Sequence, residues 1–100
     1  MAIGKKGDKT LTSSGAVNTA GKAARLLYAD FMGANAGDKL EILNGGASGS
    51  VKFTLVVPAN GQARLGPFSR DIAPVFSVDI YGKITATGNA WANFIFEELE

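Results

Sequence analysis

Short runs in which apolar and polar side chains alternate constrain the fold of this 100-residue chain more than any other feature. In the clearest run, residues 51–57, one face of an extended chain would carry Val51, Phe53, Leu55 and Val57. The same alternation recurs in residues 39–43, 76–81 and 90–97, where it puts Phe76, Val78 and Ile80 on one face. β-Branched and aromatic residues are concentrated in these runs, as half-buried strands favour. The pattern predicts strands that each bury one face.

Glycine, asparagine and proline separate the runs at intervals of about 8–15 residues. Asn44-Gly45-Gly46 can supply the positive-φ conformations of a tight hairpin, and the prolines stand at the ends of runs. This spacing predicts an all-β fold, a single antiparallel β-sandwich or jelly-roll-like domain of about seven or eight short strands. Residues 23–32 fit a strand or, by propensity, a helix. We favour the strand, because Gly33 follows immediately and a lone helix fits a small sandwich poorly.

Charge is unevenly distributed along the chain. Residues 1–25 contain five basic residues and one acid, a net charge of +4, whereas residues 26–100 carry a net charge of −3. The first segment is also rich in glycine and poor in large apolar residues, so it buries too little apolar area to order itself. We therefore expect residues 1–22 to be a flexible, basic N-terminal arm and residues 23–100 to be the sandwich domain. Within the arm, residues 9–17 could form one strand when a partner is present.

The composition excludes several kinds of chemistry. The chain contains no cysteine and no histidine, which removes disulfides, thiol nucleophiles, serine–histidine–aspartate sites and the usual zinc and haem ligands. We expect no enzyme activity, no cofactor and no metal. The longest apolar runs are far shorter than the roughly 20 residues of a spanning helix, and no secretory signal pattern is visible, so we expect no membrane partner.

Two weaker site hypotheses are less favoured than structural explanations. The glycine-rich loop 44–50 could resemble a phosphate cradle, but a predicted strand rather than a helix follows it, so we interpret it as a turn. A catalytic pair of carboxylates would need a deep cleft that a body of this size can hardly build. A loop calcium site formed by Asp30, Asp38 or Asp79 stays open as an alternative.

Basic and aromatic residues provide the candidate interface. Lys5, Lys6 and Lys9, together with Leu11, lie in the predicted arm, where they could dock on an acidic protein surface. Nucleic acid is not an expected partner, because the arm lacks the aromatic residues on which bases stack.

Three aromatic residues of the body are recognition candidates: Phe68, Tyr81 and Trp91. By strand parity Trp91 falls opposite Phe94 and Phe96, so it faces outward or packs on another subunit. Sugar stacking is the alternative role.

The order of motifs carries a resemblance. A basic polar lead ends in Thr12-Ser13-Ser14-Gly15, and the later runs are residues 40–46, 49–55, 75–80 and 85–88. In this order the chain resembles small bacteriophage virion proteins, in particular capsid decoration (cement) proteins. The resemblance implies a structural role, a β-sandwich and assembly on a symmetric shell, and it implies no catalytic residue.

These observations lead to one expected function and one alternative. We expect a non-enzymatic phage virion protein, made in the host cytoplasm, that binds the outer capsid surface and stabilises it. Its partner would be the major capsid protein or another virion protein, and the protein itself would be a homo-oligomer, a trimer or a dimer. The alternative is a carbohydrate- or receptor-binding module that uses Tyr81, Trp91 and loop 44–50.

Overall fold

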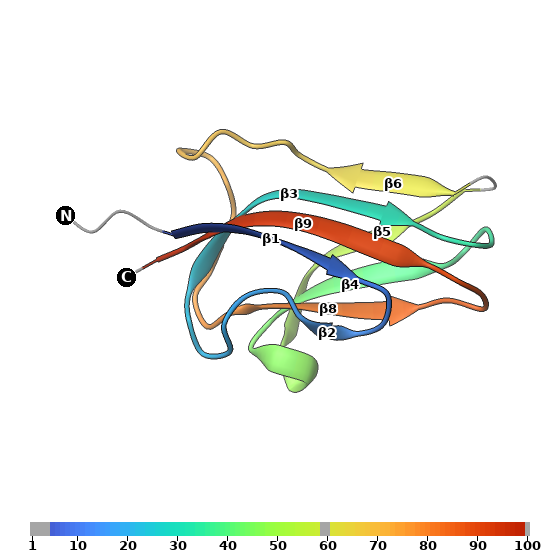
Figure 1. The fold of residues 1–100 in the computed structure, drawn as a ribbon, viewed down its shortest axis with the longest axis horizontal. Helices are drawn as coiled ribbons and strands as arrows, with labels where there is room; N and C mark the ends of the chain where they lie inside the picture. Colours follow the sequence, from blue (N-terminus) through green and yellow to red (C-terminus); the bar gives the residue numbers. More distant parts are fainter. Residues whose placement is uncertain (1–4, 59–60, 100) are drawn as a thin grey trace.

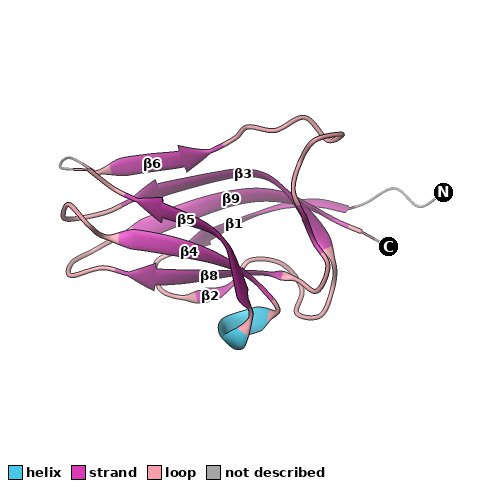
Figure 2. Ribbon diagram, turned by 180° about the vertical axis from the view of Figure 1, so that it is seen from behind, coloured by secondary structure: helices cyan, strands magenta, loops and turns pink. Residues whose placement is uncertain are grey.

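The computed structural model describes residues 5–58 and 61–99, which form two antiparallel sheets (Figures 1 and 2). Sheet A has the order β1 (Lys5–Leu11), β9 (Trp91–Glu98), β3 (Ala24–Met32) and β6 (Gln62–Leu65), and β7 (Val75–Phe76) also pairs with β3. Sheet B has the order β2 (Gly15–Ala16), β8 (Ile80–Thr85), β4 (Lys39–Asn44) and β5 (Ser50–Val56). A single 3-10 turn, η1 (Gly46–Ser48), links β4 to β5 within the described residues. The predicted all-β antiparallel sandwich is confirmed, with nine described strands.

The chain crosses between the two sheets at most of its connections. In the described part, only the β4–β5 hairpin and the β6–β7 connection remain within one sheet. The hairpin uses the predicted glycines, since Gly45 and Gly46 have φ values of 110° and 74°. None of the helical segments in residues 5–58 and 61–99 has the length and apolarity to cross a membrane.

The core lies between the sheets and consists of the inward residues of the central strands. Its fully enclosed side chains include Leu26, Phe31, Leu40, Ile42, Phe76, Ile80 and Phe94. Gly82 of β8 allows the sheets to approach closely, because a Cβ there would lie 2.7 Å from Leu11 Cδ1 and 3.1 Å from Phe94 Cζ.

The N-terminal segment is not the flexible arm that its composition predicted. Residues 5–11 form β1, which pairs with β9 along its whole length, and residues 15–16 form β2 at the edge of sheet B. Leu11 and Val17 are buried in the core. A strand that hydrogen-bonds to a preformed sheet needs few large apolar side chains, because its neighbour provides the ladder and two anchors provide the burial. Residues 1–4 of the predicted arm, and residue 100 of the predicted domain, lie outside the described residues.

The predicted buried face of residues 51–57 is only partly correct. Phe53 and Leu55 oppose Ile42 and Leu40 and pack against the core, and Val57 is buried. A β-bulge shifts the register so that Lys52 is the extra residue, which leaves Val51 exposed.

The alternation predicted for residues 76–81 also fails at one point. Phe76 and Ile80 are buried, but Val78 is exposed and Asp79 is buried. The cause is the topology, because the chain passes from β7 in sheet A to β8 in sheet B across residues 77–79.

Residues 24–32 form the strand β3, so the helical alternative for this segment is wrong. A bulge at Leu27 lets Leu26, Ala29 and Phe31 all face the core.

Candidate functional site

The outer face of sheet A, which we call the A-face, carries the exposed side chains of Trp91 and Ile95. On β9, Ala92, Phe94 and Phe96 point into the core, so the alternate residues point outward. β3 lies beside β9, with β1 on the other side (Figure 1). The outward residues of the two central strands include Tyr28, Asp30, Met32, Trp91, Asn93 and Ile95.

Two apolar cross-strand pairs dominate the A-face. Trp91 opposes Met32, and Ile95 opposes Tyr28. The exposed fractions of Trp91 and Ile95 are 39% and 43%, so both present apolar area to the outside. Directly opposite side chains in an antiparallel pair are close enough to contact, so each pair forms one apolar platform.

A polar row separates the two platforms. Asp30 and Asn93 oppose each other, and Thr10 of β1 and Arg64 of β6 continue the row. The Thr10 hydroxyl donates to Asn93 Oδ1 at 2.6 Å. The Gln62 amide donates to Asp30 Oδ1 at 2.8 Å. Hydrogen bonding therefore fixes these polar groups before any partner binds.

A shallow pocket of about 320 Å³ lies beside Ile95. It is lined by Asp8, Lys9, Thr10, Tyr28, Asn93, Phe94 and Ile95. The pocket gives the A-face a hollow in which a protruding side chain of a partner could sit.

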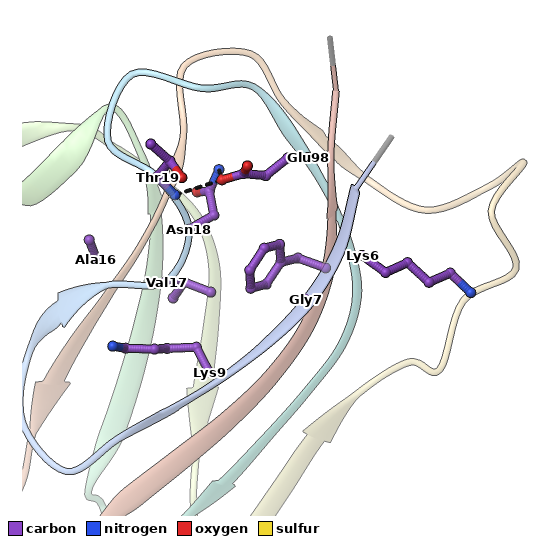
Figure 3. A pocket seen from close by; sticks show the side chains of 9 residues that line it. Lys6, Gly7, Lys9, Ala16, Val17, Asn18, Thr19 and Glu98 are labelled. Atoms are coloured by element: carbon purple, nitrogen blue, oxygen red, sulfur yellow. Dashed lines mark hydrogen bonds between the residues drawn. The ribbon is translucent and has the colours of Figure 1, made fainter. Parts of the chain in front are cut away.

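The lysines of β1 do not form one basic site. Lys6 is exposed and opposes Glu97 on the A-face side, whereas Lys9 opposes the inward-facing Phe94. In Figure 3 the Lys6 side chain points away from Thr19 and Glu98, while Lys9 extends on the side of Val17. Lys5 also belongs to β1, and its side chain is outside the described part of the structure.

A second pocket, of about 370 Å³, lies where β1 meets residues 16–19 (Figure 3). Lys9, Thr19 and Glu98 contribute to its lining. Its carboxylate is already engaged, since the Thr19 N–H donates to Glu98 Oε2 at 2.7 Å. Hydrogen bonding by the side chain and backbone of Thr19 holds the pKa of Glu98 below its usual range. The carboxylate of this pocket is therefore already hydrogen-bonded to its neighbours Asn18 and Thr19, as expected for a structural contact between β1 and residues 16–19.

The aromatic candidates of the sequence lie apart. Tyr81 opposes Leu43 in sheet B, and its neighbour Gly82 faces the core, so Tyr81 lies on the outer face of sheet B. Trp91 lies on the A-face, on the opposite side of the molecule. Phe68 is half-buried in the β6–β7 connection, where its N–H donates to the carbonyl oxygen of Leu27 at 2.8 Å. The structure thus does not assemble Tyr81, Trp91 and loop 44–50 into one site.

The buried aspartates hold loops together. Asp79 accepts backbone N–H groups from Gly21, Gly45 and Gly46 at 2.9–3.2 Å. Asp38 accepts those of Asn35, Ala34 and Thr87. The bond from Asn35 above all, with those from Thr87 and Ala34, lowers the pKa of the Asp38 carboxyl. Asp30, the third residue of the calcium hypothesis, belongs to the A-face row instead.

Glu97 is a residue whose role the sequence did not reveal. It lies on the outward side of β9 but is only 2% exposed, because Arg25 and Arg70 contact it at 3.3 and 3.0 Å. Arg70 belongs to the β6–β7 connection, which covers this end of the A-face. Strand parity marked Glu97 as outward, and only the remote arginines could have indicated its burial.

Comparisons with known proteins give a fold and no family. A scan against protein families found no match, and a search of curated proteins found none either. Among solved structures, the chain is similar to a protein of Bacillus endospore appendages, described as a novel family of disulfide-linked pili. The two share 13% sequence identity and a TM-score of 0.51 over 98% of this chain and 88% of that chain. This likeness shows a shared β-sandwich fold.

Proposed function

We propose that this chain is a non-enzymatic structural protein of a phage virion that attaches to the outer surface of the capsid through the A-face. The observation that carries the proposal is that the A-face carries two apolar pairs, Trp91–Met32 and Tyr28–Ile95, in which Trp91 and Ile95 are exposed. Buried tryptophan and tyrosine anchors dominate the energetics of protein interfaces, and surrounding polar groups exclude water. The order of sequence motifs supports the virion as the setting.

The fold supports a role in assembly. The similar Bacillus protein belongs to a pilus, which is a repetitive surface structure, so this type of sandwich is compatible with a role as a subunit. On a shell, an oligomer of this protein would bind several equivalent sites at once. Such multivalency raises the overall affinity by about 10²–10⁴ over that of one site. Modest contacts at each A-face would then suffice for stable attachment to the major capsid protein.

Co-sedimentation with emptied capsids tests this proposal. Trp91→Ala should weaken binding about tenfold or more, because it removes the largest exposed anchor. Tyr81→Ala is the matched control, since it removes an aromatic group from the outer face of sheet B. Thermal melts of both variants identify any loss from misfolding. Equal effects of the two substitutions on binding, with intact melts, would exclude the A-face as the attachment surface.

A carbohydrate-binding role is the second candidate, now restricted to the A-face. Trp91 lies one row from the hydroxyl, amide and carboxylate groups of Thr10, Asn93 and Asp30. An aromatic platform beside fixed hydrogen-bonding groups can suit a sugar ring. Glycan-array binding that is lost in both Trp91→Ala and Asn93→Ala would favour this role. Capsid binding that survives Asn93→Ala would favour the first.

A further inference from the structure

The free edge of sheet B, strand β5, is both long and apolar, a combination that no other edge strand of the described sandwich has. Among the described residues, β5 pairs on one side only, with β4, through six of its seven residues. An edge strand of this kind presents unpaired N–H and C=O groups that can pair with another chain. Val51 and Val56 are 49% and 55% exposed, and Phe53 and Leu55 reach the core while remaining only partly buried.

The other edges of the described sandwich carry features that oppose strand pairing. β2 has two residues, and β6 has four, including the exposed Arg64. β1 contains three lysines. β5 has its own protective features, Lys52 and the bulge, but both lie near its start. Residues 53–56 are left as a regular strand segment that, within the described part of the chain, pairs only with β4.

We propose that β5 pairs with β5 of a second copy of this chain, antiparallel about a two-fold axis, with Thr54 opposite Thr54. In a continuous sheet, directly opposite residues share a face, so the inward Phe53 must meet an inward residue. This register puts Phe53 of each copy opposite the partner's Leu55 and joins the two B sheets into one. Aromatic–aliphatic and threonine–threonine pairs are both favourable across strands.

The charges of the strands favour a second β5 as the partner of β5 over β1, the other edge strand that is long enough to pair. β5 carries one lysine and no acid, whereas β1 carries three lysines and one aspartate, so pairing β5 with β1 would bring like charges together. In the Thr54 register, the two Lys52 residues are not opposite each other, and each Lys52 ammonium lies 5.9 Å from the ring centre of Phe76 in its own chain. The two lysines are then separated by four residues, or about 13 Å along the strand. This exceeds the screening length of about 8–10 Å at physiological salt.

Cysteine cross-linking tests the register, because the chain has no native cysteine. Opposite Cβ atoms in an antiparallel pair lie about 4.5–5.5 Å apart, close to disulfide geometry. Oxidised Thr54→Cys should therefore form a covalent dimer in dilute solution. Thr85→Cys is the matched control, since Thr85 is also an exposed threonine on the outer side of sheet B, but lies on β8. Equal cross-linking of the two variants would overturn the proposed register.

A charge test at Thr54 measures the same interface at equilibrium. By sedimentation, the isolated protein should be a dimer of twice 10.4 kDa. Thr54→Lys and Thr54→Glu should each weaken dimerisation by about two- to five-fold, because each puts two like charges directly opposite each other across the two-fold axis. Mixing the two variants should restore a dimer with one copy of each, since opposite charges then face each other. A wild-type monomer at every soluble concentration, or a dimer indifferent to these changes, would overturn the proposal. No capsid is involved, so failure here leaves attachment through the A-face untouched.

Discussion

At the scale of single residues, buried carboxylates hold the loops in place by accepting hydrogen bonds from backbone N–H groups. Asp79 joins two separate loops, because one of its oxygens accepts the N–H of Gly21 and the other accepts those of Gly45 and Gly46. Asp79→Ala should lower the free energy of unfolding by about 2–4 kcal/mol, since it leaves backbone donors unpaired. Asp79→Asn keeps one acceptor oxygen and should cost less. Urea denaturation measures both, and a change within about 0.5 kcal/mol for the alanine variant would contradict this role.

Asp38 makes stability depend on pH in a defined direction. Its pKa is lowered in the folded protein, chiefly by the Asn35 N–H, and that of Glu98 is lowered by Thr19. A lowered folded pKa stabilises the protein above the unfolded pKa, about 3.9 for aspartate and 4.3 for glutamate. That stabilisation is lost as the pH falls through the folded value. Unfolding free energies should therefore be flat above about pH 5 and fall below about pH 4. Asp38→Asn should make this acid slope shallower, and an unchanged slope would exclude Asp38 as a cause.

At the scale of elements, β1 is the strand that contradicts the flexible N-terminal arm predicted from composition. It covers one edge of β9, and its Leu11 lies in the core. Deleting residues 1–11 should abolish cooperative thermal unfolding, because the β9 edge and Phe96 lose their cover. Leu11→Ala should cost about 2–5 kcal/mol, while the exposed Lys6→Ala should stay within about 0.5 kcal/mol. A truncated protein with an unchanged melting temperature would restore the flexible-arm interpretation.

The strands with alternating apolar residues could be predicted from the sequence, but β1 and the pairing partners of the strands could not. Alternation within one run sets which residues share a face, which is why Trp91 was placed opposite Phe94 and Phe96. Parity says nothing about which sheet a strand joins, so Tyr81 and Trp91 could not be assigned to opposite sides of the molecule.

The remaining errors have the same origin in contacts between distant residues. The bulge at Lys52 depends on pairing with β4, and the burial of Asp79 depends on a crossing between sheets. Glu97 is enclosed only because Arg25 and Arg70 reach it from other parts of the chain. No local sequence signal indicated these ion pairs of Glu97, and the role of Trp91 as an interface anchor stays a prediction.

At the scale of the whole molecule, the topology predicts slow folding. The first and last described strands are neighbours, with Lys5 opposite Glu98, and most connections cross between sheets. Folding that depends on such remote pairings takes milliseconds to seconds, whereas local structures form in microseconds. Stopped-flow refolding, followed by the single tryptophan, should show a main phase of about a millisecond to seconds. A complete microsecond phase would contradict this dependence on remote contacts.

The neighbouring positions of β1 and β9 also have a consequence during protein synthesis. β1 is translated before the other described strands and its pairing partner β9 after them, so β1 waits as an unpaired strand while the strands between them are made. On a polysome, such strands of adjacent nascent chains could pair with one another. Lysine is the residue that most effectively opposes this kind of edge-to-edge association. The three lysines of β1 would then protect the protein before it has folded, whatever they contact afterwards.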